Sequence, residues 1–362
     1  MAAAVAPYYN LVVLNACEST DGTYEIEIRY GEIVEVIIYY PKIDNNKLLL
    51  SPVRRLGKLI KALWVGINHI ESIFGEPELI HLHVIFPVGY FVWGYLRFKK
   101  IPLIITEHWT GFSGLKRSSL RFYHKLPGYL CTSISKKILP VSESIMNDMV
   151  RLNFRGSYEV IPNVVDHNIF KAKGKLKLKS NPFTFLHVSS LNDDIKNVSG
   201  IIKAFKKFHE FITDSRLLII GDGKDMQELQ KLTNILGING NVRFIGHIPH
   251  ECVAFEMEKA DVFVLFSFVE TFSCVLLEAL SVGMPVITSN CGGISSWISE
   301  KEGILVEPGD VEGLRASMEF MFGNYQSFMP GIRREIVYSC GKDKIGMKLK
   351  NIYLSILENS VA

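Results

Sequence analysis

The sequence lacks the features that mark disulfide-rich, zinc-binding or nucleic-acid-binding proteins. Its six cysteines are scattered along 362 residues, with no Cys-x-x-Cys pair and no His/Cys cluster, which argues against a disulfide framework and a zinc site. The 40 basic and 37 acidic residues nearly balance, so the charge gives no reason to expect a nucleic-acid partner. Repeats and low-complexity tracts are also lacking. We therefore expect a globular protein of the reducing cytoplasm.

Segments that would direct the chain into a membrane are also lacking. The opening Met-Ala-Ala-Ala-Val-Ala-Pro has no basic region and no long apolar core, so we expect no signal peptide. Residues 79–98 carry little charge and have the length of a spanning helix. Pro87 and Gly89 divide this run, however, into a buried strand and a helical stretch. We expect a cytoplasmic protein, either free or peripheral on the inner face of the cell membrane.

Apolar and amphipathic stretches alternate along the second half of the chain. Strands are predicted at 183–189, 217–220, 242–245, 261–266 and 286–289, and helices at 198–212, 225–236, 251–259 and 273–282. Repeated strand–helix units predict an α/β fold with a parallel, doubly wound sheet, which binds ligands beyond the carboxyl ends of its strands. A chain of this length can form two such domains.

The first half shows the same alternation after an irregular opening. Strands are predicted at 11–16, 24–30, 33–40, 79–84, 102–107, 138–142 and 158–162, with a hairpin through Gly31 and a helix at 54–73. His81 and His83 lie on one face of a predicted strand, where we expect them to be packed structural residues. A lysine-rich connector, Lys171–Lys179, links the halves, and a helix at 342–357 ends the pattern.

The most informative motif is a pair of glutamates, Glu270 and Glu278, eight positions apart. Glu270 follows a predicted strand, Ser273 is placed to cap the next helix, and Glu278 lies about two turns along that helix. The N–H groups of a first helical turn have no intrahelical partner, and the helix dipole favours an anion there. The motif therefore predicts a site for an anion flanked by sugar hydroxyls, as in a nucleotide diphosphate-sugar.

This motif and its flanks resemble the retaining GT-B glycosyltransferases of family 4, in the branch that builds bacterial polysaccharides. The flanking motifs are Phe244-Ile245-Gly246-His247, Ala260-Asp261-Val262-Phe263-Val264, Gly283-Met284-Pro285-Val286-Ile287, Gly292-Gly293-Ile294 and residues 303–310. The resemblance implies two Rossmann-like, doubly wound parallel-sheet domains that face a cleft. It places an acceptor-side domain at residues 1–167, a nucleotide-sugar domain at 168–340, and a helix at 341–362 that packs back on the first domain.

The resemblance also implies roles for individual residues. Glu270 and His108 become the catalytic candidates, because Glu270 would bind hydroxyls of the donor sugar near its reacting carbon and His108 would face that sugar across the cleft. Glu278 would bind the ribose hydroxyls, and Lys196 the diphosphate. The remaining donor-binding candidates are the backbone groups of Gly223, Phe272, Ser273 and Cys274. The structural alternatives are a solvated face of a helix for the glutamates and simple packing for the histidine.

The activity that the resemblance implies is that of a retaining hexosyltransferase. It would move a sugar from a nucleotide diphosphate-sugar to a glycan or lipid-linked acceptor in capsule, O-antigen or exopolysaccharide synthesis. No Asp-x-Asp stands in a metal-binding setting, so we expect neither a metal nor a cofactor besides the donor substrate. The alternative is a non-catalytic protein that binds sugar nucleotides.

Two departures from the family pattern bear on this activity. The arginine that the family places on the diphosphate falls near Ser190, yet no arginine occurs from 156 to 215, and Asp193 and Asp194 add negative charge there. The first residues resemble the end of the family's first helix. We therefore expect the opening strand and glycine-rich loop to be missing, and the chain to be a weak or inactive transferase that is prone to self-association.

The first predicted domain is rich in cations interleaved with aromatic residues. The cations are Arg54, Arg55, Lys58, Lys61, Lys99, Lys100, Lys116, Arg117, Arg121 and Lys125. They form either ordinary solvated faces or a surface for anionic lipid, to which each basic residue adds roughly 1 kcal/mol of attraction. A lipid-linked acceptor would make the second interpretation useful.

Overall fold

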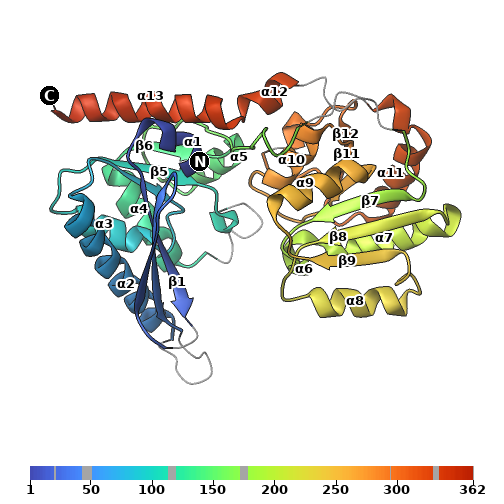
Figure 1. Cartoon of the computed structure of the whole chain (residues 1–362), viewed down its shortest axis with the longest axis horizontal. Coiled ribbons are helices and arrows are strands. Elements are labelled where there is room, and N and C mark those ends of the chain that lie inside the picture. Colours follow the sequence, from blue (N-terminus) through green and yellow to red (C-terminus); the bar gives the residue numbers. More distant parts are fainter. Residues whose placement is uncertain are drawn as a thin grey trace. The chain divides into compact units, whose positions relative to one another are not determined.

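The chain folds into two compact units. The computed structural model describes residues 1–19, 22–42, 51–112, 120–171, 178–293, 295–328 and 334–361. Unit 1 contains Met1–Pro162 and Lys342–Ala362, and unit 2 contains Asn163–Gly341 (Figure 1). Most of the connector predicted at Lys171–Lys179 lies outside the described residues, as do Lys116 and Arg117.

Unit 2 is built on a parallel sheet of six strands in the order β12-β11-β10-β7-β8-β9. These are β7 (Phe183–Val188), β8 (Ser215–Ile220), β9 (Val242–Gly246), β10 (Val262–Leu265), β11 (Val286–Ser289) and β12 (Gly303–Val306). Strands β10 and β11 are buried along their whole length, as expected when helices cover both faces of a parallel sheet. The strand order reverses between β7 and β10, and this switch point is where open sheets of this kind bind ligands.

The helices of unit 2 alternate with these strands as the sequence predicts. They are α6 (Asp193–Lys196), α7 (Val198–Phe211), α8 (Met226–Ile235), α9 (His250–Lys259), α10 (Cys274–Val282), η4 (Ser295–Trp297), α11 (Val311–Gly323), η5 (Tyr325–Ser327) and α12 (Arg334–Ser339). Both predicted ends of α10 are confirmed. The Ser273 Oγ accepts a hydrogen bond from the Leu276 N–H at 3.3 Å, and Gly283 ends the helix with φ +83°.

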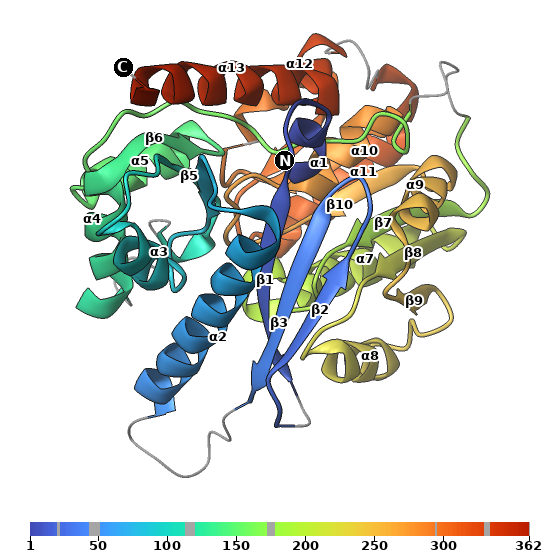
Figure 2. The same cartoon turned by 60° about the vertical axis from the view of Figure 1, so that its left-hand side comes forward.

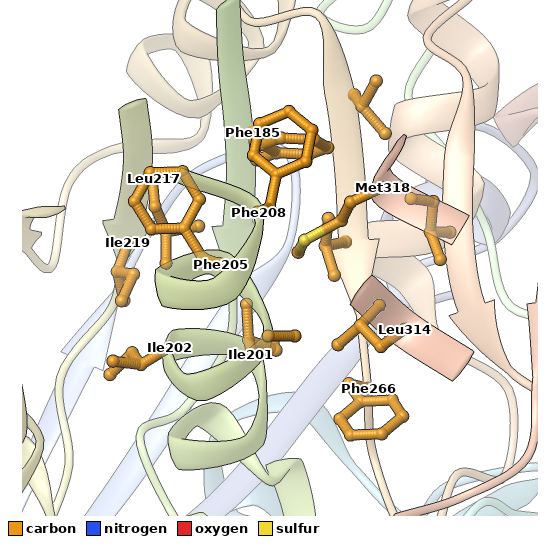
Figure 3. Close-up of a cluster of buried hydrophobic side chains, with 14 of the residues drawn as sticks. Phe185, Ile201, Ile202, Phe205, Phe208, Leu217, Ile219, Phe266, Leu314 and Met318 are labelled. Carbon is orange, nitrogen blue, oxygen red and sulfur yellow. The ribbon is translucent and has the colours of Figure 1, made fainter. Parts of the chain in front are cut away.

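Several phenylalanines lie in the core of unit 2 among aliphatic side chains (Figure 3). Phe205 and Phe208 on α7 pack towards Phe185 on β7, and the rings of Phe185 and Phe208 meet edge to face with centroids 5.0 Å apart. Leu314 and Met318 on α11 complete the same cluster, and all five side chains are fully buried. This core holds the central strand of the sheet in place, and with it the loop that leaves the carboxyl end of β7.

The described part of unit 1 contains two sheets of three strands. Strands β1 (Val12–Ser19), β3 (Val34–Pro41) and β2 (Glu25–Arg29) form the first sheet in that order, with β1 parallel and β2 antiparallel to β3. The second sheet is parallel and contains β4 (Ile80–His83), β5 (Leu103–Glu107) and β6 (Ser135–Pro140) in that order. The hairpin predicted through Gly31 is confirmed by the pairing of β2 with β3.

One predicted strand, at residues 158–162, is wrong. Only an isolated bridge joins Tyr158 to Ile138, although the N–H of Ile161 still donates to the Pro140 oxygen at 3.0 Å. Because Pro140 and Pro162 have no N–H group, the ladder cannot continue along this segment. Strand β6 also begins three residues earlier than the prediction of 138.

The helices of unit 1 are α1 (Ala2–Val5), η1 (Ala6–Tyr8), α2 (Ser51–Phe74), α3 (Gly89–Leu96), η2 (Thr110–Phe112), α4 (Phe122–Ile134), α5 (Glu143–Arg151) and α13 (Lys342–Val361). Helix α13 packs against α1 (Figure 2). A Cβ at Gly346 would lie 2.0 Å from the Ala4 oxygen, so a glycine is needed for this close approach. Among the described helices, none combines the length and the apolar character required to cross a membrane.

Candidate functional site

Lys196 and Glu270 meet at the switch point of the unit 2 sheet. Lys196 ends the short helix that follows β7, and Glu270 lies in the loop that follows β10. The Lys196 Nζ is 2.6 Å from the Glu270 Oε1, and the two side chains are only 19% and 9% exposed. The sheet topology thus brings a cation and a carboxylate into contact from segments 74 residues apart.

A third side chain, not predicted from the sequence, contacts this pair. The Ser267 Oγ donates to the same Glu270 Oε1 at 2.8 Å, and Ser267 is fully buried. Its signal in the sequence is its position directly behind the strand predicted at 261–266, where an open sheet presents its ligand groups. With two donors on one oxygen, the Glu270 carboxylate is held in a fixed orientation.

Gly292, in the loop after β11, supports the backbone of Glu270. It has φ +74°, and a Cβ there would lie 2.5 Å from the Glu270 carbonyl oxygen. The next residue, Gly293, donates its N–H to the Thr271 oxygen at 2.9 Å. The loops after β10 and β11 therefore pack backbone to backbone, and only glycine fits at position 292.

Glu278 lies inside α10 in surroundings unlike those of Glu270. It is 6% exposed, and burial raises its pKa, although His250 opposes the shift. The His250 Nε2 is 4.0 Å from the Glu278 Oε1, and His250 is the first residue of α9. The Glu278 carboxyl is buried, and its distance from His250 is at the upper limit for an ion pair. It is therefore suited to accept hydrogen bonds from ligand hydroxyls.

Phe272 and Cys274 flank the Ser273 cap of α10. The ring of Phe272 is buried against Trp297 with centroids 5.1 Å apart, and its carbonyl oxygen accepts a hydrogen bond from the Asn163 Nδ2 at 3.0 Å. Together with the Ser273 cap, these residues fix the position of the first turn of α10.

Gly223 packs directly against the loop that follows β7. A Cβ at this position would lie 2.5 Å from the Leu191 oxygen and 2.8 Å from the Leu191 nitrogen. The Leu191 N–H in turn donates to the Asp222 oxygen at 2.9 Å. The Gly221-Asp222-Gly223 turn therefore forms one wall beside the segment that carries Lys196.

The negative charge that replaces the expected arginine is balanced locally. The Lys224 Nζ lies 2.5 Å from the Asp194 Oδ2 and 3.7 Å from the Asp225 Oδ2. Asp193 accepts the N–H of Ser199 at 2.8 Å. Lys196 thus keeps its contact with Glu270 instead of pairing with these nearby aspartates.

His108 belongs to unit 1, whereas every other candidate lies in unit 2. It directly follows β5 and is partly buried, and burial lowers its pKa, which favours the neutral ring at physiological pH. The preceding Glu107 is fully buried and accepts the N–H groups of Ile85 at 3.0 Å and Trp109 at 2.8 Å. Burial raises the pKa of Glu107 to about 7, although these hydrogen bonds oppose the shift. Glu107 therefore has a structural role, and His108 is the residue at the strand end that could contact a ligand.

Known protein families account for both units. The model described as Glycosyltransferase Family 4 matches residues 5–169, and the model described as Glycosyl transferases group 1 matches residues 168–327. The chain belongs to the group 1 glycosyltransferases. The resemblance stated from the glutamate motif and its flanks is therefore confirmed at the level of the family.

Relatives and solved structures agree with this assignment. N-acetyl-alpha-D-glucosaminyl L-malate synthase of Bacillus anthracis is 26% identical over 311 residues, which is 81% of this chain and 79% of the relative. The matches to several other curated relatives span only 58–59% of the relatives' own length.

The fold is that of the GT-B glycosyltransferases, with two Rossmann-like domains. Sucrose-phosphate synthase from Thermosynechococcus elongatus superposes with a TM-score of 0.78 at 18% identity, over 99% of this chain and 92% of that one. The Anabaena HepE protein in complex with UDP-glucose gives a TM-score of 0.70 at 17% identity, over 87% and 86% of the two chains. The α/β, GT-B fold predicted from the sequence is confirmed.

Proposed function

We propose that this glycosyltransferase moves a sugar from a nucleotide diphosphate-sugar to a glycan or lipid-linked acceptor, with retention of configuration. The observation that carries the proposal is the contact between Lys196 and Glu270 at the switch point of unit 2. The ammonium supplies charge for the departing diphosphate, and the first-turn N–H groups of α10 add to it. The second oxygen of Glu270 remains to bind hydroxyls of the donor sugar.

The proposed step exchanges one bond to the anomeric carbon for another. The oxygen of an acceptor hydroxyl forms a bond to the anomeric carbon while the bond between this carbon and the diphosphate oxygen breaks. The hydroxyl proton passes to the departing phosphate oxygen, so the products are a glycoside and a nucleoside diphosphate. When attack and departure use the same face, the configuration is kept without a carboxylate nucleophile. Glu270 suits this scheme because Lys196 and Ser267 already hold one of its oxygens.

For the acceptor side, we propose that His108 faces the donor sugar and that the acceptor is polymeric or lipid-linked, as in capsule, O-antigen or exopolysaccharide synthesis. A surface feature of unit 1 supports contact with anionic lipid on the inner face of the membrane. Phe98 is 88% exposed, and the Arg97 guanidinium lies 5.8 Å from its ring and 5.2 Å from the ring of Trp93. Aromatic rings and cations together are suited to a headgroup layer.

The experiment for this proposal is a transfer assay with UDP-, GDP- and ADP-sugars and with lipid extract as acceptor. We expect release of nucleoside diphosphate with one donor, and a product with the anomeric configuration of that donor by proton NMR. An inverted product would rule out retention. The alternative is a non-catalytic sugar-nucleotide-binding protein, and the lack of an arginine near Ser190 supports it. Binding of a donor with no release of nucleoside diphosphate under any condition would favour this alternative.

Turnover is expected to be independent of divalent metal. In the proposed site, Lys196 and the first-turn N–H groups of α10 meet the charge of the diphosphate, so a bridging cation has no role. The rate should be the same in excess EDTA as in buffer containing Mg²⁺. Loss of turnover in EDTA that Mg²⁺ or Mn²⁺ restores would contradict the proposal.

Glu278→Ala is expected to remove most of the thermal stabilisation that a nucleoside diphosphate gives the wild-type chain. Without the carboxylate, the bound ribose hydroxyls lose their acceptor, and each unpaired polar group costs about 1–3 kcal/mol. The matched control is Glu319→Ala, which changes a helix glutamate in the surface ion pair with Arg315. Differential scanning fluorimetry with and without nucleotide measures the effect, and a full shift in the Glu278 variant would overturn the ribose assignment.

A further inference from the structure

A chain of hydrogen bonds joins the C-terminal helix α13 to the strand end that carries His108. The Tyr353 Oη on α13 lies 2.5 Å from the Nδ1 of His81 on β4. The Nε2 of the same ring lies 2.7 Å from the Oγ1 of Thr106 on β5, two residues before His108. Tyr353 is 5% exposed and Thr106 is fully buried, so water does not compete for these contacts.

The three histidine rings of this region form a row that ends at His108. The rings of His81 and His83 are tilted by 32° with centroids 4.4 Å apart, and the two residues alternate along one face of the strand. The ring of His83 then meets that of His108 at a steep angle, with centroids 6.1 Å apart. His81 is therefore linked to His108 by two successive ring contacts.

The electrostatics of His81 restrict how its two hydrogen bonds are arranged. Burial, with repulsion from His83, holds the pKa of His81 well below its ordinary value, so the ring is neutral. A neutral imidazole has one donor and one acceptor nitrogen. One of the two hydroxyls, of Tyr353 or of Thr106, must therefore donate to the ring, and the other must accept from it. The direction of either hydrogen bond thus fixes the tautomer of His81 and the direction of the second bond.

The same network fixes the backbone around His108. Thr106 is held through its side chain by His81, and Glu107 through its carboxylate by the N–H groups of Ile85 and Trp109. His108 follows these two anchored residues, so its Cα position depends on both. Without the hydrogen bond to Tyr353, His81 can adopt either tautomer. The direction of its hydrogen bond with Thr106 is then no longer fixed.

We propose that Tyr353 is a positioning residue for His108, acting through His81, His83 and the end of β5. The proposal rests on the proposed function, in which His108 faces the donor sugar. The C-terminal helix α13 would then help to position a residue of the site, in addition to stabilising unit 1. Tyr353 itself touches His81 and Tyr9 in this arrangement and has no chemical role in the transfer.

The test compares Tyr353→Phe with Tyr9→Phe. Each variant removes one hydroxyl from a pair of tyrosines whose rings lie 5.4 Å apart. The Tyr9 Oη donates to the Lys350 oxygen on α13 at 3.1 Å, whereas the Tyr353 Oη contacts His81. Only Tyr353 reaches a histidine. We expect Tyr353→Phe to lower kcat by about tenfold or more with an unchanged donor Kd, because misplacement of a group in the site costs rate and not donor binding. Tyr9→Phe should keep kcat within about twofold of wild type.

A second measurement does not depend on turnover. Imidazole ¹⁵N–¹H NMR spectra, assigned with His108→Gln, should show shifted His108 resonances in Tyr353→Phe and unshifted ones in Tyr9→Phe. Unmoved His108 resonances in Tyr353→Phe would overturn the proposal, and so would an equal loss of kcat in both variants. If the wild-type chain transfers no sugar, the proposed function fails, while the response of the His108 resonances still decides the positioning role.

Discussion

Glu270→Gln is expected to lower kcat by about two to three orders of magnitude, the usual cost of removing one preorganised charged or polar group from a reaction centre. The amide keeps the shape of the side chain and can still accept hydrogen bonds from Lys196 and Ser267. It removes the negative charge, however, so the Lys196 ammonium loses its counterion in a site where both side chains are mostly enclosed. Initial rates of nucleoside diphosphate release, with donor saturating, measure the change.

The matched control is Glu228→Gln. Glu228 and Lys231 form a pair with a similar separation, 2.7 Å, but both side chains are largely exposed on α8. Loss of such a surface pair has little effect, so this variant should turn over at the wild-type rate. If Glu270→Gln keeps more than about a tenth of the wild-type kcat, Glu270 does not have the role that the electrostatic argument gives it.

Gly292→Ala is expected to lower kcat by about a hundredfold or more while leaving unit 2 folded. A Cβ at this position would lie 2.5 Å from the Glu270 oxygen and 2.9 Å from the Glu270 Cβ, so the loop that carries the carboxylate must move. A displacement of about 1 Å is enough to lose a factor of a hundred in rate. Kinetic assays give the loss in kcat, and circular dichroism of the variant shows whether the fold is kept.

Gly237→Ala separates this displacement from simple backbone strain. Gly237 also has a positive φ, +67°, but no atom lies within 4 Å of the position that its Cβ would take. Both substitutions carry the same cost of about 1–2 kcal/mol for an alanine in the left-handed region. Gly237→Ala should therefore lower the melting temperature but keep kcat. Equal kinetic losses in the two variants would show that strain, and not the contact with Glu270, explains the effect.

Local signals were sufficient to predict most elements of the fold. Ser273 and Gly283 bracket a helix by capping rules that depend on a few neighbouring residues, and α10 begins and ends where those rules place it. The strand predicted at 158–162 shows the limit of such signals. Its composition favours a strand, but the pairing depends on Pro140 in another segment, which cannot donate to a ladder.

The candidate site required information that local sequence does not contain. Strand order decides that the loops after β7 and β10 are neighbours, and no periodicity in the sequence reports strand order, so the proximity of Lys196 and Glu270 was expected only from the family resemblance. Ser267 could have been found from its place at a strand end. The contact between His81 and Tyr353, 272 residues apart, could not, because the pattern of β4 predicts only that His81 packs.

The most direct test of the central claim is a ³¹P NMR titration of nucleoside diphosphates with the purified chain. If the switch point of unit 2 holds the diphosphate on Lys196, the phosphate resonances of at least one of UDP, GDP and ADP should shift or broaden with the wild-type chain. The same change should occur with Lys231→Met, which removes an exposed cation from α8, and should be lost with Lys196→Met. Equal perturbation by Lys196→Met, or no perturbation of any of the three nucleotides by the wild-type chain, would contradict the account.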